Sequence, residues 1–266
     1  MRCTRFAFLF ILALIVPFAF AQQPSTSANQ GPAILQKALL ALVPSTSIND
    51  ITLSGTARRI AGSDDESGTV VIKAVAGTGT RIDLTLPSGP RSEIRNTSSV
   101  PFAGSWSGPD DVTHSASYHN ILVDPGWAPA LTIASLLSAQ NSVITYFGPE
   151  TRNGQSVIHV SASQQFPGTS GDTASLMQHL TQTDLYFDAT TLLPAAIAFS
   201  THPDNNANLD IPIELDFYNY TAVNGAQIPF RIQKYINNIL ALDFQVNSVV
   251  LNSGLSAATF SVGAGF

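Results

Sequence analysis

The chain has 266 residues, of which 44% are hydrophobic and only 11% are charged. The hydrophobic share is too high for a disordered chain, and the length is sufficient for a substantial core in one or two domains. With 12 Lys and Arg against 18 Asp and Glu, the formal net charge of −6 argues against a nucleic-acid partner, because such binding depends on neutralising phosphates.

Residues 1–21 have the features of a secretory signal peptide. Two arginines precede an apolar run over Phe6–Val16, and Ala19-Phe20-Ala21 provides a cleavage site for the peptidase. Pro17 interrupts the run, which is shorter than the roughly 20 residues of a spanning helix. We therefore predict cleavage after Ala21, a periplasmic or secreted location, and no transmembrane helix in the mature chain.

Cleavage removes Cys3, the only cysteine of the chain, so the mature protein cannot rely on disulfides. Extracellular eukaryotic domains are generally rich in disulfides, which favours a bacterial envelope origin. Residues 22–30 are rich in Ser, Thr, Asn and Gln and predict a flexible leader. We expect residues 31–266 to form a single domain.

Two apolar helices are predicted, one near each end of the first half. Apolar residues recur at spacings of three and four over 32–43 and over 129–139, and each stretch has a proline in its first turn. Residues 174–182 fit either a short third helix or the beginning of a strand.

Strands are predicted over most of the remaining chain. The clearest are in the last third, where apolar and polar residues alternate on both sides of the Asn224-Gly225 turn. Residues 87–126 and 165–172 are predicted to be loops. The predicted strands are 51–60, 69–76, 81–86, 142–147, 155–161, 211–218, 228–233 and 240–247.

Turns at this spacing predict an antiparallel meander with one apolar and one polar face. The apolar face must be covered, and the two apolar helices are the available cover. The fold class is therefore α+β, with a curved antiparallel sheet wrapped around helices.

The meander also carries a series of short motifs in a fixed order. They are a D-x-T-x-x-L-P turn over 188–194, an N-G-x-x-I-P hairpin over 224–229 and a V-x-L-N end over 249–252. Their order and spacing resemble the C-terminal half of the LolA/LolB-like superfamily of periplasmic lipoprotein carriers, outer-membrane lipoprotein-sorting proteins and envelope-stress sensors. The match covers about residues 180–260.

The resemblance implies an unclosed, strongly curved β half-barrel with two or three apolar lid helices. Its concave face would hold an apolar ligand beneath the helices at 32–43 and 129–139. In carriers of this superfamily an arginine helps to hold the lid closed. Arg58, Arg59 and Arg81 lie in early strands, and no motif selects one of them.

Four apolar residues are predicted to line the ligand site. Trp106 and Trp127 flank the polar loop between them, and a tryptophan at a pocket mouth offers a large area with one polar atom. Leu39 and Leu136 lie on the predicted helices. The alternative for the tryptophans is ordinary packing in the core.

No residue set predicts an active site, a metal or a cofactor, so we expect a non-enzymatic protein. The segment Gly104-Ser105-Trp106-Ser107-Gly108 resembles a nucleophile elbow, but tryptophan stands where serine is needed. A solvated loop is favoured over a zinc site for one polar cluster, because a His-x4-His spacing fits no regular zinc site. The cluster consists of Asp110, Asp111, His114, His119 and Asp124.

The remaining histidines are predicted to have structural or no roles. His159 is expected on a strand with a hydrogen-bonded side chain. His179 and His202 lie beside loops and have no partner that the sequence reveals.

The favoured function is binding or carrying a lipid or an acylated ligand, with envelope proteins as further partners. A sensor or scaffold that binds a protein, and a hydrolase or metal enzyme built around residues 104–126, are alternatives. An integral outer-membrane barrel is a third, since Phe260, Val262, Ala264 and Phe266 alternate towards the end. Pro212 and Pro229 argue against it, because proline is unsuited to central strands.

Overall fold

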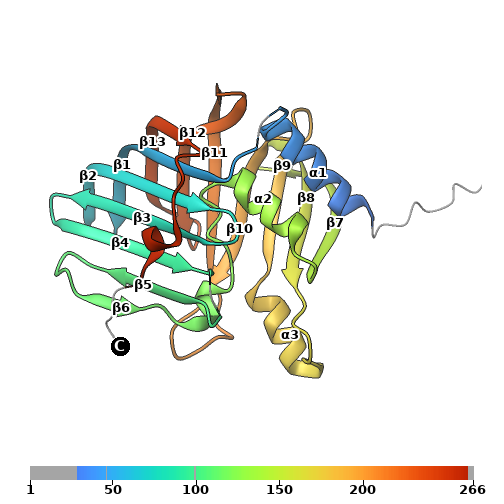
Figure 1. Ribbon diagram of the computed structural model, residues 1–266, viewed down its shortest axis with the longest axis horizontal. Coiled ribbons are helices and arrows are strands. Elements are labelled where there is room, and N and C mark those ends of the chain that lie inside the picture. The colour runs from blue at the N-terminus through green and yellow to red at the C-terminus, as the bar shows by residue number, and fades with distance from the viewer. Residues whose placement is uncertain (1–28, 46, 99, 263–266) are drawn as a thin grey trace, which may run out of the picture.

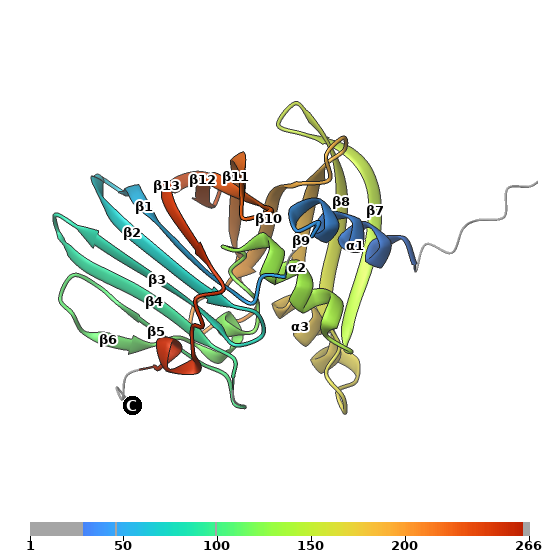
Figure 2. The ribbon, with the colours of Figure 1, turned by 45° about the horizontal axis from the view of Figure 1, so that its top comes forward.

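The computed structural model describes residues 29–45, 47–98 and 100–262. The predicted signal peptide, its cleavage site and most of the predicted leader lie outside these ranges. The described chain forms a 13-stranded antiparallel sheet that curves around helices, as Figures 1 and 2 show, which confirms the predicted α+β half-barrel.

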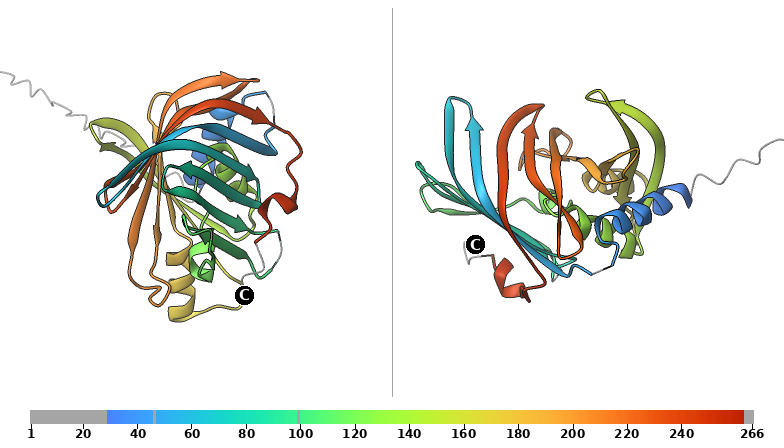
Figure 3. Two further views of the ribbon diagram at one scale, coloured as in Figure 1. Left: turned by 90° about the vertical axis from the view of Figure 1, so that its left-hand side faces the viewer. Right: turned by 90° about the horizontal axis from the view of Figure 1, so that it is seen from above.

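The sheet consists of two meanders that meet at a pairing between its first and last strands. The strand order is β6-β5-β4-β3-β2-β1-β13-β12-β11-β10-β9-β8-β7. In the described chain β6 and β7 do not pair with each other, so the sheet stays open along these two edges (Figure 3). The first meander consists of β1 (Asp50–Ala61), β2 (Asp64–Val75), β3 (Gly79–Leu86), β4 (Gly89–Asn96), β5 (Ala103–Ser107) and β6 (Thr113–Ser115).

The second meander is longer and carries the regular alternation predicted from the sequence. In β11 the side chains of Ile213, Leu215 and Phe217 are buried, while Glu214 between them is only partly buried. The strands are β7 (Ser142–Arg152), β8 (Gln155–Gln164), β9 (Thr183–Asp188), β10 (Pro194–Thr201), β11 (Ile211–Val223), β12 (Ala226–Ile236) and β13 (Ile239–Leu251).

Two helices lie side by side on the inner face of the sheet, which is the face that carries the core (Figures 1 and 2). They are α1 (Gln30–Leu42) and α2 (Pro129–Ser138). Leu35, Ala38 and Leu42 of α1 are almost completely buried, as the spacing of three and four predicts. Helix α1 contacts α2, β7, β8 and β12.

The undecided stretch 174–182 is mainly helical. Helix α3 (Gly171–Leu180) precedes β9 at the lower end of the sheet in Figure 1. None of the helices in the described ranges is long and apolar enough to cross a membrane.

The prediction of loops over 87–126 is wrong, because this region contains β4, β5, β6, the short 3-10 helix η2 (Tyr118–Ile121) and the approach to α2. Strand β4 has no fully buried residue. Its inner face carries Arg91, Glu93 and Arg95 where a strand in an ordinary core has apolar side chains. The alternation that identifies a half-buried strand is therefore missing.

The C-terminal segment is fixed to the beginning of β1. The carboxylate of Asp50 accepts hydrogen bonds from the backbone N–H groups of Ser253, Gly254 and Leu255. Residues 257–260 form the 3-10 helix η3 (Ala257–Phe260), so Phe260, the first residue of the alternation that motivated the barrel alternative, is not in a strand. The side chain of Phe260 is fully buried, and residues 263–266 lie outside the described ranges.

Candidate functional site

Two adjoining pockets, here called the tryptophan pockets, open on the inner face of the first meander. Their volumes are about 270 and 260 Å³. Ile94, Ile121 and Phe199 contribute to the first, and Leu84 and Leu242 to the second. Both pockets share one wall, which consists of Ile82, Glu93, Trp106, Trp127 and Lys234.

The two tryptophans of this wall differ in burial. Trp127 is 2% exposed and belongs to the core, whereas Trp106 is 44% exposed. The indole of Trp106 stacks on the ring of His114, with the ring centroids 4.2 Å apart. One tryptophan is therefore held rigidly in the wall, and the other has a face open to solvent.

The other two predicted lining residues lie elsewhere. Leu39 on α1 and Leu136 on α2 are half-buried and pack against the core beneath the helices. Neither is among the residues that line the tryptophan pockets. The structure thus brings two of the four predicted residues together and places the other two between the helices and the sheet.

The second pocket is rich in cations that the sequence did not reveal as a group. Arg59, Arg91 and Lys234 line it, against the single carboxylate of Glu93. The Nζ atom of Lys234 is 4.0 Å from the Glu93 carboxylate. The Nη1 atom of Arg59 is buried without a hydrogen-bond partner in the described part of the chain, and the carboxylate of Glu66 is 3.6 Å from this atom and from Nη2 of Arg91. This wall has more positive than negative charge beside an apolar surface.

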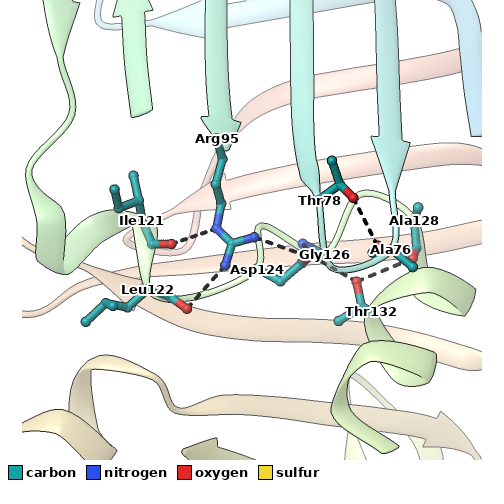
Figure 4. A network of polar contacts seen from close by, with 9 residues as sticks. All are labelled: Ala76, Thr78, Arg95, Ile121, Leu122, Asp124, Gly126, Ala128 and Thr132. Atoms are coloured by element: carbon teal, nitrogen blue, oxygen red, sulfur yellow. Dashed lines mark hydrogen bonds and ion pairs between the residues drawn. The ribbon is translucent and has the colours of Figure 1, made fainter. Parts of the chain in front are cut away.

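The first pocket is closed on one side by the segment 118–128, which β4 holds through a largely buried arginine. Arg95 donates from Nε to the backbone oxygen of Ile121 (2.7 Å) and from Nη2 to that of Leu122 (3.3 Å), as Figure 4 shows. Its Nη1 atom is 3.7 Å from Asp124. Burial lowers the pKa of Arg95, and the charge of Asp124 opposes that shift.

Asp124 extends this network to α2. Its Oδ1 atom accepts hydrogen bonds from the backbone N–H of Gly126 (2.8 Å) and from the hydroxyl of Thr132 (3.0 Å) in the first turns of the helix (Figure 4). The contacts of Arg95 therefore connect the first meander to the helix that covers the second.

In the described part of the chain, none of the three arginines singled out in the sequence holds the segment 118–128 as Arg95 does. Arg58 pairs with Asp65 in the neighbouring strand, and Arg81 pairs with Asp83 of its own strand. Arg59 lies in the second pocket, as described above. Arg95 was missed because it lies in the region predicted to be a loop.

The polar cluster predicted as a solvated loop does not come together as a metal site. His114 is in β6 against Trp106, Asp124 is bound to Arg95, and Asp110 accepts a hydrogen bond from the backbone N–H of Val112. His119 lies apart from them, near His202. The segment that resembles a nucleophile elbow lies in and beside strand β5, without the strand-to-helix turn of that motif.

The structure confirms one prediction for the other histidines and contradicts another. His159 is hydrogen-bonded to Asp184 and stacks between Phe147 and Tyr186, in the structural role expected. In contrast, His179 and His202 do have a partner. Both contact the same carboxylate oxygen of Asp210.

No family model and no curated protein sequence matches the chain. Solved structures do match along most of its length, with probability 1.00. One is described as an outer membrane lipoprotein-sorting protein domain from Vibrio parahaemolyticus. It has 12% sequence identity and a TM-score of 0.55, and the match covers 88% of this chain and 97% of that one.

Two further structures have the same fold. A LolA superfamily protein from Nitrosomonas europaea has 11% identity and a TM-score of 0.54, with 87% and 97% of the two chains covered. A DUF1329 family protein from Desulfovibrio piger has 9% identity and a TM-score of 0.54, with 88% and 97% covered. The resemblance found from residues 180–260 is therefore confirmed for the fold, and it extends over most of the chain.

Proposed function

We propose that the protein is a non-enzymatic, periplasmic or secreted carrier that binds an amphiphile with an acyl chain and an anionic head group. The observation that carries this proposal is the pair of tryptophan pockets, which combine an apolar inner wall with a cationic side. Each is near the lower end of the roughly 300–1,000 Å³ typical of small-molecule sites. A chain lying along the shared wall can occupy both.

The apolar part of the ligand is assigned to the shared wall. Burial of an acyl chain in these pockets, where Trp106 is the exposed aromatic side chain of the shared wall, contributes about 0.8 kcal/mol for each CH₂ removed from water. Trp106, with its face open to solvent, offers the largest contact area that a ligand can cover.

The anionic head group is assigned to the second pocket. The buried Nη1 atom of Arg59 lacks a hydrogen-bond partner, and Arg91 and Lys234 lie around the same pocket. A carboxylate or phosphate supplies an acceptor for Nη1 of Arg59 and a further negative charge beside Lys234, whereas Arg91 already donates to Ser88 and Gly89. The predicted signal peptide supports an envelope location, and the lipoprotein-sorting description of the Vibrio structure supports acylated cargo as one class.

Competition binding tests the proposal with the full-length mature protein. Dodecanoate, which is anionic, and dodecanol, which is neutral, are each titrated against a bound fluorescent fatty acid. We expect both to compete, with dodecanoate the stronger ligand. Trp106→Ala is expected to weaken both by about tenfold, which corresponds to about 1.4 kcal/mol of lost contact.

Matched variants separate the two parts of the site. Lys234→Gln is expected to weaken dodecanoate but not dodecanol, whereas Lys37→Gln, a change at an exposed lysine of α1, leaves both unchanged. Phe147→Ala removes a 64% exposed aromatic residue outside the pockets and serves as the control for Trp106→Ala. Equal effects of the two aromatic substitutions, or no competition by either ligand, contradict the proposal.

A further inference from the structure

A second polar cluster lies outside the tryptophan pockets, where three elements meet at the lower end of the second meander. His179 is in the last turn of α3, His202 directly follows β10, and Asp210 directly precedes β11. The Oδ1 atom of Asp210 is 2.9 Å from Nε2 of His179 and 3.0 Å from Nε2 of His202. One carboxylate oxygen thus contacts both imidazoles.

The distances match the requirements of a small divalent cation. One ligand atom from each of the three residues lies within 4.8 Å of the others. Bonds of about 2.0–2.2 Å to a tetrahedral zinc ion place its ligand atoms roughly 3.3–3.6 Å apart. The side chains of His179 and Asp210 are 41% and 44% exposed, so they have room to move until their ligand atoms reach the spacing that zinc requires.

His202 is the fixed member of the cluster. Its side chain is 1% exposed, and its backbone N–H and C=O are both hydrogen-bonded to the side chain of Asn120 at 2.8 Å. Such preorganisation reduces the entropy lost when an ion is bound.

Two unpartnered nitrogen atoms lie beside the cluster, although neither is one of the three proposed ligand atoms. Nε2 of His119 and Nδ1 of His202 are both buried and have no hydrogen-bond partner in the described part of the chain. The two rings lie edge to face, with centroids 5.9 Å apart. Buried polar atoms without partners are rare in folded proteins and call for a specific explanation.

The cluster also has access from solvent. His179 and Asp210 line a polar hollow of about 420 Å³ together with Gln182, Asp184 and Glu214. Three protein ligands with an open fourth position on a hollow are the arrangement that zinc takes when it also binds a small ligand or water.

We propose that His179, His202 and Asp210 bind one divalent transition-metal ion of the zinc type. On binding, the proton of each neutral imidazole moves from Nε2 to Nδ1 by exchange with solvent, so that both Nε2 atoms and the carboxylate coordinate the ion, which connects α3 to the ends of β10 and β11. Imidazole nitrogen and carboxylate oxygen suit Zn²⁺ better than Ca²⁺ or Mg²⁺, which prefer oxygen ligands alone. This site is separate from the tryptophan pockets and does not depend on the proposed carrier function.

Calorimetry on the tag-free, chelator-treated protein tests this assignment directly. Titration with zinc chloride is expected to show one Zn²⁺ per chain, with a Kd of about 10 µM or tighter. His179→Gln and Asp210→Asn, both at exposed positions, are each expected to weaken binding by at least about tenfold. His114→Gln, at an exposed histidine outside the cluster, is expected to leave it unchanged.

X-ray absorption of the zinc-loaded wild-type protein gives a measurement that does not depend on the folding of variants. The expected spectrum shows nitrogen and oxygen neighbours with outer-shell scattering from two imidazoles. The assignment is overturned if the wild-type protein binds no zinc stoichiometrically. It is equally overturned if the spectrum lacks imidazole scattering, or if His114→Gln weakens binding as much as His179→Gln.

Discussion

Arg95 donates hydrogen bonds to two backbone oxygens of the segment 118–128 while its own side chain is only 16% exposed. Arg95→Met leaves the oxygens of Ile121 and Leu122 without these donors. We expect a loss of about 1–3 kcal/mol in the free energy of unfolding, since unsatisfied buried acceptors cost that much. Thermal unfolding measures the loss, and amide hydrogen exchange locates faster opening in residues 118–128.

An exposed arginine provides the control. Arg58 pairs with Asp65 at the surface, with side chains 53% and 50% exposed, and such pairs contribute about 1 kcal/mol or less. Arg58→Met is therefore expected to change stability much less than Arg95→Met. Equal losses in the two variants contradict the role assigned to Arg95.

Asp216 is a second residue whose surroundings predict a measurable effect. Its side chain is buried beside Glu214 on the same strand, and burial together with this carboxyl group raises its pKa to about 7. Below about pH 4 both the folded and unfolded states are protonated at this residue. As the pH rises from there to 7, the unfolded state loses the proton first, so stability falls with rising pH.

Asp216→Asn removes this dependence, because asparagine stays neutral. The stability of the variant relative to wild type is expected to rise between about pH 4 and pH 7, with a gain of about 1–3 kcal/mol at the upper end. Asp188 has the opposite shift, since hydrogen bonds from Thr191 lower its pKa. Asp188→Asn is thus expected to be most destabilising at neutral pH and less so in acid. If the stability of both variants relative to wild type changes with pH in the same direction, the assignment is contradicted.

At the scale of elements, the strands were predictable where one face is apolar and the other polar. β11 shows this alternation along its core-facing residues. β4 has charged side chains on its inner face, and the three residues of β6 are all exposed, so neither strand has the pattern that identifies it. These strands exist because they extend a sheet already formed by β1 to β3, which is a tertiary effect that local sequence does not encode.

The candidate site residues also divide into those that the local sequence reveals and those that only the folded chain reveals. Trp106 and Trp127 could be proposed from the sequence because large aromatic side chains stand out in it. Arg95 and its acceptor Ile121 are 26 residues apart, and His179 and Asp210 are 31 residues apart. Contacts over such separations have no characteristic spacing, so they become visible only when the chain is folded.

Asp50 fixes the C-terminal segment to the beginning of β1, and this connection can be tested separately. Asp50→Ala removes the acceptor for the backbone N–H groups of residues 253–255, and hydrogen bonds to a charged group contribute about 1.5–3 kcal/mol. We expect faster amide exchange over 253–260 and a lower Tm. Asp64→Ala, at an exposed residue that begins β2, should cause neither change; protection of 253–260 that is unaltered in Asp50→Ala contradicts this account.

At the scale of the whole molecule, the inner face of the open sheet has two regions, one packed beneath helices and one with open pockets. The second meander is covered by α1 and α2 and contributes about half of the residues of the packed core (Figure 2). The inner face of the first meander has the tryptophan pockets instead. In the described part of the chain, apolar residues therefore form both a closed interior and an open surface with pockets.

The chain contains two tryptophans, and both lie in the wall that the two pockets share. Their fluorescence therefore reports on the proposed acyl site alone. Bromine quenches an indole only at near contact, so a dodecanoate brominated along its chain is the most direct probe. We predict that it quenches both Trp106, observed in Trp127→Phe, and Trp127, observed in Trp106→Phe, whereas unbrominated dodecanoate does not. Binding of the brominated ligand without quenching of either tryptophan contradicts the central claim that the acyl chain lies in the tryptophan pockets.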